Sequence, residues 1–282
     1  MLVIDQSAII MAGFQLRGYF VLKDIFPVPA FRDNYLWTFV DGDSVCACVV
    51  DPGDAEPVIE YLESRQLRLS HILITHHHAD HTGGLDTLSK RYAPQVYGPA
   101  NSRIQGITTA LGDGDSFELF GTTMEVLTVP GHTLDHIAYY AASPGDIDAP
   151  ALFCGDTLFA AGCGRLFEGD PAMMYASLQK LARFEGKTRV YCTHEYTLNN
   201  LRFASAVEPG NQAIQNRVRM ESAKREAGTP TLPSTLELEL STNPFLRCED
   251  SSLAQIAEVK AGHPLQGAVE VFATLRQWKD SF

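Results

Sequence analysis

Seven histidine and aspartate residues stand at the ends of short apolar runs, where a folded chain could bring them together. Four of the nine histidines and one aspartate fall within residues 76–81, in the run Thr-His-His-His-Ala-Asp-His that starts at Thr75. Three more histidine or aspartate residues farther along the chain also follow short apolar runs. The seven residues are His76, His78, Asp80, His81, His132, Asp156 and His194. Imidazole and carboxylate groups bind catalytic divalent ions in proteins, so this set predicts a metal centre.

The number and spacing of these residues favour two ions. Side chains alternate along an extended chain, so His76 and His78 point to the same side. A catalytic zinc takes three protein ligands and a water, and seven candidates are too many for one such ion. We therefore predict two ligand groups, namely His76, His78 and His132 for one ion, and Asp80, His81 and His194 for the other. Asp156, with two carboxylate oxygens, is predicted to bridge the two ions. With a bridging hydroxide the centre keeps a net positive charge, which would stabilise a developing oxyanion.

Other polar residues near this set are assigned supporting or structural roles. His77 points away from its neighbours and is predicted to support the loop. Two interpretations of Asp51 stay open, a turn residue or a hydrogen-bond acceptor that orients the histidine loop. Neither Cys163 nor Cys192 has a partner at the spacing of a zinc knuckle or a Cys-His dyad, so both are predicted to be structural. His71, His136 and His263 are also predicted to be structural.

Composition limits the class of protein. The chain has 282 residues, of which 45% are hydrophobic and 20% charged, which excludes a disordered or fibrous protein. Its net charge of −12 opposes non-specific binding to nucleic acids or to an anionic membrane surface. Six cysteines are too few for a disulfide scaffold, and we expect free thiols, a cytoplasmic location and a monomer. The first residues lack the basic segment of a secretory signal, and no apolar run reaches the about 20 residues of a membrane helix.

The elements that must position the site alternate between strands and helices in the first two thirds of the chain. Apolar runs predict strands at 19–22, 35–40, 45–50, 71–75, 95–97, 116–120, 123–129, 136–142, 151–154 and 189–192. A hairpin turn is predicted at Asp41-Gly42-Asp43. Helical periodicity predicts helices over 57–67, 82–92, 172–184, 198–206, 211–226 and 265–279. This order predicts a layered α/β core followed by a mostly helical last third.

The histidine cluster and the three later residues resemble the signature of the metallo-β-lactamase superfamily, T-H-x-H-x-D-H followed by His, Asp and His. The resemblance implies an α/β fold, the four-layer αββα sandwich, with two metals at one edge of its sheets. Downstream motifs resemble glyoxalase II, the hydroxyacylglutathione hydrolases, at 153–159, 161–165, 168–169, 191–197, 243–245 and 276–280. The resemblance runs from about residue 18 to the end. It implies an extension over 1–17, a catalytic domain over 18–192 and a smaller, mostly helical substrate-binding domain over 193–282.

The glyoxalase II resemblance also implies a set of residues that hold the glutathione moiety. By motif position they are Arg165, Phe167, Tyr196, Arg276 and Lys279. Arg165 stands where some members have Lys, which keeps the charge and changes its geometry. Phe167 stands where some members have Tyr, so a hydroxyl contact is lost. Without the resemblance, Arg276 and Lys279 could equally form a solvated helix face near a helix end.

The activity implied by the resemblance is hydrolysis of the thioester of S-(2-hydroxyacyl)glutathione. With S-D-lactoylglutathione the products are glutathione and D-lactate, the second step of methylglyoxal detoxification. A thiolate leaves readily, so a strong general acid is not required. Asp80, which could orient the attacking hydroxide, and Asp156 are the predicted catalytic carboxylates. The ligand types suit two zinc ions, with iron or manganese also compatible.

Other functions remain as alternatives. Within the superfamily these are a lactonase, a β-lactamase, a persulfide dioxygenase and a tRNA-processing nuclease. A dioxygenase would use one iron and lack the helical last third, a secreted lactamase would need an export signal, and a nuclease would need a basic RNA-binding arm. Outside enzymes, a metal-binding or redox-sensing module is the alternative, although a structural site would more often contain cysteine ligands.

Overall fold

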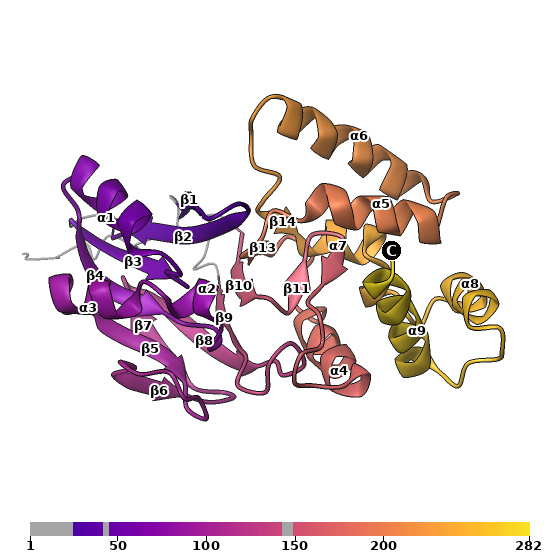
Figure 1. Cartoon of the computed structure of the whole chain (residues 1–282), viewed down its shortest axis with the longest axis horizontal. Coiled ribbons are helices and arrows are strands. Elements are labelled where there is room, and N and C mark those ends of the chain that lie inside the picture. Colours follow the sequence, from indigo (N-terminus) through magenta and orange to yellow (C-terminus); the bar gives the residue numbers. More distant parts are fainter. Residues whose placement is uncertain (1–24, 42–44, 143–148) are drawn as a thin grey trace, which may run out of the picture.

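Two six-stranded sheets face each other in the computed structural model, which describes residues 25–41, 45–142 and 149–282 (Figure 1). Helices cover the outer face of each sheet. The predicted extension at 1–17, the predicted strand at 19–22 and the centre of the predicted hairpin turn, Gly42 and Asp43, lie outside the described residues.

The first sheet has the order β1-β2-β3-β4-β5-β6. Its strands are β1 (Ile25–Ala30), β2 (Asn34–Val40), β3 (Cys46–Val50), β4 (Arg68–Leu73), β5 (Gln95–Pro99) and β6 (Thr109–Leu111). Strands β3 to β6 run parallel, and β1 and β2 are antiparallel to their neighbours. Parallel neighbours need crossover connections, which α1 (Ala55–Ser64) and α3 (Leu85–Tyr92) provide, with the one-turn α2 (Ala79–Thr82) before α3.

Strand β2 shows how the sequence fills both faces of this sheet. Alternate side chains of a strand point to opposite faces. Leu36 belongs to the outer core under α1 and α3, whereas Trp37 and Phe39 belong to the core between the sheets. The buried residues of α1 and α3 that complete the outer core are Val58, Ile59, Leu62, Leu85 and Leu88. All seven positions of β2 except the last are buried, as expected of a strand covered on both sides.

The second sheet has the order β14-β13-β10-β9-β8-β7. Its strands are β7 (Ser116–Leu119), β8 (Thr122–Thr128), β9 (Ile137–Ala141), β10 (Ala151–Gly155), β13 (Arg189–Cys192) and β14 (Ser234–Thr235). A separate hairpin of β11 (Leu158–Phe159) and β12 (Gly162–Cys163) follows β10. Strand β14 comes from the last third of the chain, so the helical part contributes an edge strand to the sheet.

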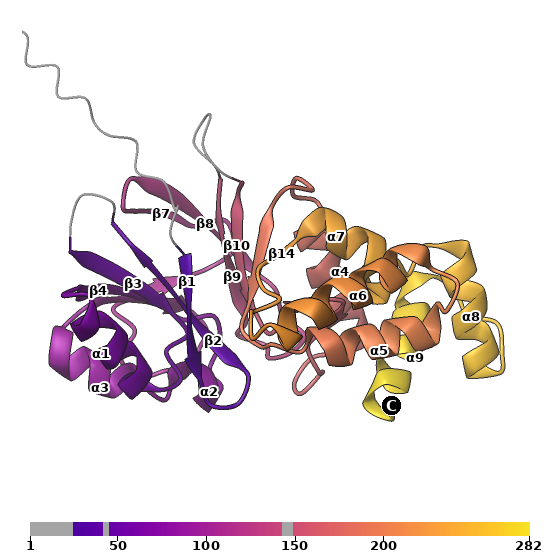
Figure 2. The ribbon, with the colours of Figure 1, turned by 90° about the horizontal axis from the view of Figure 1, so that it is seen from above.

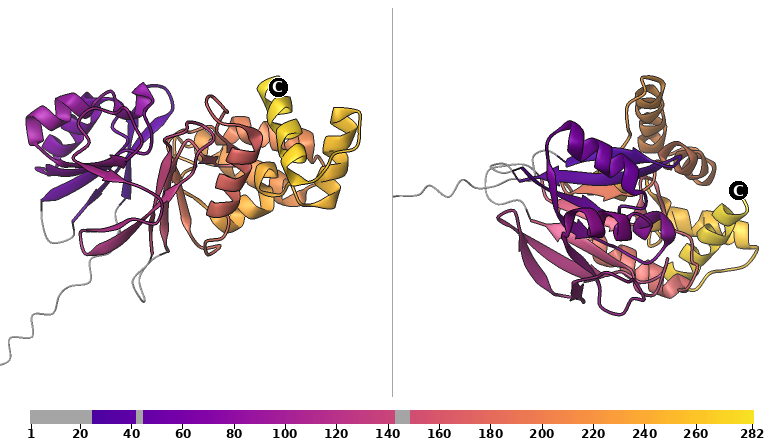
Figure 3. Two further views of the ribbon diagram at one scale, coloured as in Figure 1. Left: turned by 90° about the horizontal axis from the view of Figure 1, so that it is seen from below. Right: turned by 60° about the vertical axis from the view of Figure 1, so that its left-hand side comes forward.

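Helix α4 (Pro171–Leu181) and the helices of the last third form the outermost layer beyond the second sheet (Figure 2). The helices of the last third are α5 (Thr197–Val207), α6 (Gln212–Glu226), α7 (Leu236–Thr242), α8 (Ser251–Ala261) and α9 (Ala268–Asp280), with a short 3-10 turn η1 (Pro244–Leu246). The view from below in Figure 3 repeats the order helices, sheet, sheet, helices. The expected αββα sandwich with a helical C-terminal part is therefore confirmed. None of the described helices is long and apolar enough to cross a membrane.

The element predictions hold with shifted ends and some omissions. Strand β4 begins at Arg68 and ends at Leu73, so residues 74–75, predicted as strand, lie in the loop that leads to the histidines. Strands β1, β6 and β14, the β11–β12 hairpin, and helices α7 and α8 were not predicted. The six predicted helices are all present, each within a few residues of its expected ends.

Candidate metal centre

The predicted residues come from loops that leave β4, β8, β10 and β13 and from the one-turn helix α2, and they meet at one edge of the sandwich. Two hydrogen bonds fix the histidine loop against β9 of the opposite sheet. Ile137 N donates to Thr75 O at 2.9 Å, and the Tyr139 hydroxyl donates to Ile74 O at 2.8 Å. Loops held by a rigid sheet can display side chains in a fixed arrangement.

The first predicted ligand group is assembled. Nε2 of His76 lies 3.1 Å from Nδ1 of His78, and Nε2 of His132 lies 3.0 Å from that same Nδ1. The three nitrogens converge closely enough to share one ion. Burial lowers the pKa of all three imidazoles below the usual range, so they are neutral and their nitrogens can donate an electron pair to a metal.

The second predicted group lies beside the first. Oδ2 of Asp80 is 3.6 Å from Nε2 of His81 and 3.4 Å from Nε2 of His194. These three atoms also lie within the range of a shared ion. His76 also groups with His81 and Asp156, so the two groups adjoin.

Asp156 stands between the two groups. Its Oδ2 lies 3.4 Å from Nε2 of His132 in the first group and 3.4 Å from Nε2 of His194 in the second. Its Oδ1 lies 3.4 Å from Nε2 of His81. Burial alone would raise the pKa of Asp156, but the neighbouring rings of His81 and His194 hold that pKa well below its usual range. The side chain is therefore an anion placed to reach both groups.

Two buried atoms of this cluster fit a bound cation. Nε2 of His81 and Oδ1 of Asp156 are inaccessible to solvent and have no hydrogen-bond partner within the described chain. A buried polar atom without a partner costs about 1–3 kcal/mol, and such an atom in a native protein calls for an explanation. A divalent ion held by these residues would satisfy both atoms.

Asp51 holds the histidine loop in place. Its carboxylate accepts hydrogen bonds from Thr75 N at 2.7 Å, from the Thr75 hydroxyl at 2.7 Å and from Nδ1 of His81 at 3.0 Å. The bond to Nδ1 leaves Nε2 of His81 facing Asp156. Of the two interpretations of Asp51, the orienting acceptor is confirmed, because a turn residue would make no such contacts.

Residues at the turn between β1 and β2 support the second group. The sequence did not reveal this support. Nδ1 of His194 lies 2.9 Å from Oδ1 of Asp33, and Nδ2 of Asn34 donates to Oδ2 of Asp80 at 3.3 Å. Backbone bonds reinforce this junction, since Tyr35 N donates to Thr193 O at 2.7 Å. In the sequence, Asp33 and Asn34 look like ordinary turn residues.

His136, predicted to be structural, lies directly behind the site. Its ring stacks on that of His76 with centroids 4.6 Å apart, and its Nε2 accepts a hydrogen bond from Asp156 N at 3.0 Å. Complete burial lowers the pKa of His136 to about 3, so the ring stays neutral and keeps its acceptor nitrogen. Sequence offered no sign of this role, because His136 is the first residue of an apolar run predicted as a strand.

His77 points away from both groups, as predicted. Its Nδ1 lies 2.9 Å from Oδ1 of Asp135 and its Nε2 lies 3.5 Å from Oε1 of Glu168. Asp135 also accepts hydrogen bonds from the hydroxyls of Thr133 and Ser102. This network ties the histidine loop to the loop that carries His132.

Two glycines allow the ligand loops to approach one another. A Cβ on Gly53 would lie 1.8 Å from Asp80 O, and a Cβ on Gly164 would lie 1.9 Å from Asp156 O. Real Cβ atoms do not approach backbone atoms this closely, so only glycine fits at either position.

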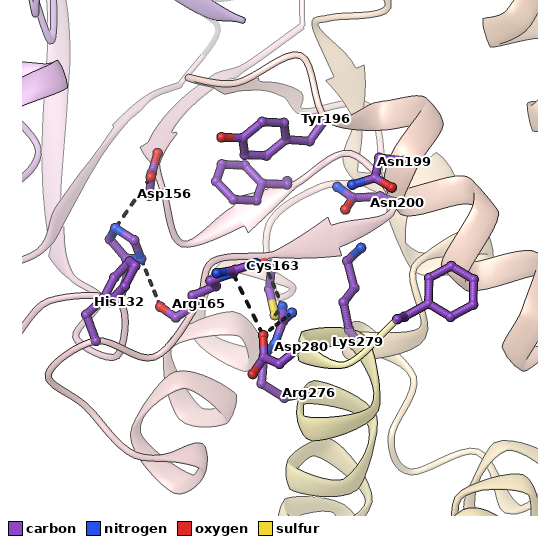
Figure 4. A pocket seen from close by; sticks show the side chains of 13 residues that line it. His132, Asp156, Cys163, Arg165, Tyr196, Asn199, Asn200, Arg276, Lys279 and Asp280 are labelled. Atoms are coloured by element: carbon purple, nitrogen blue, oxygen red, sulfur yellow. Dashed lines mark hydrogen bonds and ion pairs between the residues drawn. The ribbon is translucent and has the colours of Figure 1, made fainter.

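A pocket of about 510 Å³ opens from His132 and Asp156 towards the last helix (Figure 4). All five residues expected to hold glutathione line it, together with polar side chains of α5 and α9. The lining residues are His132, Asp156, Phe159, Cys163, Arg165, Phe167, Tyr196, Asn199, Asn200, Arg276, Lys279, Asp280 and Phe282.

The aromatic lining residues lie next to the histidines. Phe167 is exposed and sets its ring against His78 and His132, with centroids 5.5 and 5.2 Å apart. The ring of Tyr196 stacks on His194 at 4.7 Å. Burial, with help from Asp33, raises the pKa of Tyr196 to about 12, so its hydroxyl stays protonated and can donate a hydrogen bond.

The basic lining residues differ in how freely they can meet a ligand. Arg276 is buried; its Nη1 donates to Cys163 O at 3.0 Å and its Nη2 to Oδ1 of Asp280 at 2.8 Å. Arg165 is exposed at the pocket edge. Lys279 lies over the ring of Phe203 at 5.2 Å. Burial, followed by the charge of Arg276, lowers the pKa of Lys279 to about 8.

Comparison with known proteins agrees with the resemblance in the sequence. The model of the metallo-β-lactamase superfamily matches residues 32–194, and the model described as the hydroxyacylglutathione hydrolase C-terminus matches residues 195–282. The hydroxyacylglutathione hydrolase of Pseudomonas paraeruginosa is 54% identical over 256 residues, which cover 90% of this chain and 98% of the relative. That of Hahella chejuensis is 51% identical over 262 residues, with coverages of 93% and 100%.

Solved structures share the fold. ETHE1 from Myxococcus xanthus aligns with a TM-score of 0.58 and 22% identity, covering 88% of this chain and 94% of that one. TTHA1623, solved in a di-iron-bound form, aligns with a TM-score of 0.53 and 27% identity, covering 79% and 100%. Both halves of the sequence thus match one family along nearly their whole length. The chain belongs to the hydroxyacylglutathione hydrolases, or glyoxalase II enzymes, a family of hydrolases within the metallo-β-lactamase superfamily.

Proposed function

We propose that this hydrolase cleaves the thioester of S-(2-hydroxyacyl)glutathione, with S-D-lactoylglutathione as its substrate and glutathione and D-lactate as products. One observation carries the proposal. A pocket with His132 and Asp156 at one end has the basic residues Arg165 and Lys279 farther along (Figure 4). An acyl group at the first end would leave the two carboxylates of glutathione near the basic residues.

The metal content proposed for the site is two divalent ions. His76, His78 and His132 would hold one ion, Asp80, His81 and His194 the other, and Asp156 would bridge them. The unpartnered buried atoms of His81 and Asp156 support this set, and the di-iron form of TTHA1623 supports the count. Zinc is the metal we propose, with iron or manganese as alternatives that suit the same ligands. When bound, such ions lower the pKa of a shared water and polarise a carbonyl group.

The side chains of the chain supply orientation and binding. Asp80 and Asp156 reach towards the space between the two groups and would orient the attacking water by accepting its hydrogen bond. Tyr196, protonated at neutral pH, would donate a hydrogen bond to the substrate. Phe167 would pack against the glutathione backbone without the hydroxyl contact of a tyrosine. Arg165 and Lys279 would hold the carboxylates of glutathione. Arg276 would position the Cys163 carbonyl and Asp280, to which it donates hydrogen bonds.

Turnover of S-D-lactoylglutathione, measured together with metal content, tests this proposal. We expect the wild-type protein to hold two metal equivalents and to prefer this thioester over lactone, β-lactam and persulfide substrates. Asp156→Asn and His78→Ala should each lose at least about a hundredfold in kcat/KM. Asp86→Asn, an exposed change on α3, serves as the control. Near-normal turnover with full metal content in either variant would overturn the assignment.

We propose a monomer in the cytoplasm, with a catalytic domain over 18–192 and a substrate-binding domain over 193–282. All six cysteines are present as thiols, and all but Cys46 are buried. Size-exclusion chromatography with light scattering tests the monomer.

A further inference from the structure

One carboxylate lies in the pocket away from the candidate metal ligands. Asp280, at the end of α9, lines the same pocket as Arg165, Arg276 and Lys279. Figure 4 shows its carboxylate between the side chains of Arg165 and Arg276. Its Oδ1 lies 2.8 Å from Nη2 of Arg276 and 3.9 Å from Nε of Arg165. The side chain is 46% exposed, against 5% for Arg276, so Asp280 remains accessible from the pocket.

Holding Arg276 uses only one oxygen of this carboxylate. Arg276 is already anchored by the Cys163 carbonyl and lies over the ring of Phe245 with 5.2 Å between its Cζ and the ring centroid. Within the described chain, both interactions of Asp280 use Oδ1. Its other oxygen, Oδ2, is therefore available to a ligand.

The charges of the pocket and of the glutathione moiety can be compared directly. A glutathione thioester carries two carboxylates and one α-ammonium, on its γ-glutamyl arm, at neutral pH. A pocket with only basic groups would match the carboxylates and repel the ammonium. A carboxylate in such a pocket weakens the binding of an anionic ligand, unless the carboxylate contacts a cationic group of the same ligand. Asp280 is the one acidic residue that lines the described pocket apart from Asp156.

We propose that Asp280 binds the α-ammonium of the γ-glutamyl arm and makes the pocket select glutathione thioesters with a free amino group. This proposal rests on the proposed function, because it assumes that a glutathione thioester occupies the pocket. It adds a specificity determinant to the residues that hold the carboxylates. Thioesters of carriers without an ammonium group would leave Oδ2 of Asp280 without a partner and would be disfavoured.

The test pairs a change in the protein with a change in the ligand. We would measure KM for S-D-lactoylglutathione and for the same thioester acetylated on its α-amino group, using zinc-loaded wild type, Asp280→Asn and Glu270→Gln. Glu270→Gln removes one negative charge from the same helix outside the pocket and is the matched control. In the wild type and the control, acetylation should raise KM about fivefold, a typical effect for a partly exposed ion pair. Asp280→Asn should raise KM for the parent substrate by a similar factor and abolish the effect of acetylation.

Two results would overturn the role of Asp280. An equal rise in KM for both substrates would mean that Asp280 merely orients Arg276. A fall in KM for both would mean that the carboxylate only repels an anionic ligand.

Calorimetric binding of glutathione and of N-acetylglutathione to the same three zinc-loaded proteins separates this proposal from the proposed function. If the thioester is not hydrolysed, the proposed function fails, yet a preference for glutathione that Asp280→Asn removes still supports the role of Asp280. Equal affinities of the wild type for the two peptides, or no binding of either, would overturn it.

Discussion

Asp33 and His194 are 161 positions apart in the sequence, yet Oδ1 of the first lies 2.9 Å from Nδ1 of the second. The contact joins the turn after β1 to the loop after β13, so it links the two sheets at the site. Histidines that bind metals commonly donate their second ring N–H to a carboxylate, which fixes the ring and raises its basicity. Asp33 therefore positions one proposed ligand of the second ion.

Replacing Asp33 by alanine should weaken metal binding at one of the two proposed positions. We expect about a tenfold loss of affinity for that ion, because His194 would lose the partner that orients its ring. Metal content after equilibration with a chelator of known affinity gives the measurement, and Asp86→Asn is again the control. Two metal equivalents retained at the wild-type chelator concentration would contradict the positioning role.

Gly164→Ala should disturb the site through the backbone. The new Cβ would lie 1.9 Å from Asp156 O, so the loop after β10 would have to move. Overpacking of this kind typically costs about 1–3 kcal/mol, and metal content should fall with stability. Urea unfolding and metal analysis measure the two effects. Gly210→Ala is the matched control, because a Cβ there meets nothing within 4 Å. Equal stability of the two variants would show that the loop accommodates the methyl group.

The buried ion pair of Arg217 and Glu239 makes a separate stability prediction. Nη2 of Arg217 lies 2.5 Å from Oε1 of Glu239, both side chains are almost fully buried, and Oε2 of Glu239 accepts a hydrogen bond from Ala161 N next to the pocket. Arg217→Met should cost about 3–5 kcal/mol, because it leaves a buried carboxylate without its counter-charge.

Adding Glu239→Gln to Arg217→Met should recover a large part of the lost stability, because the buried charge is then gone while an acceptor for Ala161 N remains. Denaturant unfolding of the two single variants and the double variant measures the coupling. A double variant no more stable than Arg217→Met would rule out the uncompensated charge as the cause.

Substrate binding should weaken at high pH through Lys279. Its pKa is lowered to about 8, by burial first and then by Arg276, so the ammonium is charged below that pH and neutral above it. We expect kcat/KM for S-D-lactoylglutathione to fall about threefold to tenfold between pH 7 and 9.5, through loss of one ionic contact. Lys279→Arg, which keeps its charge, should remove this fall. A similar decline in both proteins, corrected for spontaneous hydrolysis, would exclude Lys279 as its source.

The sequence revealed most of the candidate site because the proposed ligands carry their signal locally. Four histidines within six positions and polar residues directly after apolar strands are visible without a fold. Asp33, Asn34 and His136 were missed for the opposite reason. Their partners are distant in the sequence, and an aspartate or asparagine in a turn normally serves the turn itself.

The missed helices have a similar physical explanation. Helix α8 buries only Leu253 and Ala257, so it shows little of the periodic apolar pattern that marks a helix. Helix α7 has seven residues and follows a segment rich in proline and serine. Its buried Glu239 and Thr242 also break the expected separation of apolar and polar faces. Tertiary contacts, rather than local sequence, define these two helices.

The pairing of β14 with β13 has a consequence for any shortened form of the protein. Strand β14 satisfies the outward backbone groups of β13 at Arg189 and Val190. A fragment that stops near residue 195 would bare this edge, and an unprotected edge invites other chains to add to it. Deleting the residues after about 195 should therefore yield a fragment that self-associates. The fragment would also lack about half of the residues that line the pocket.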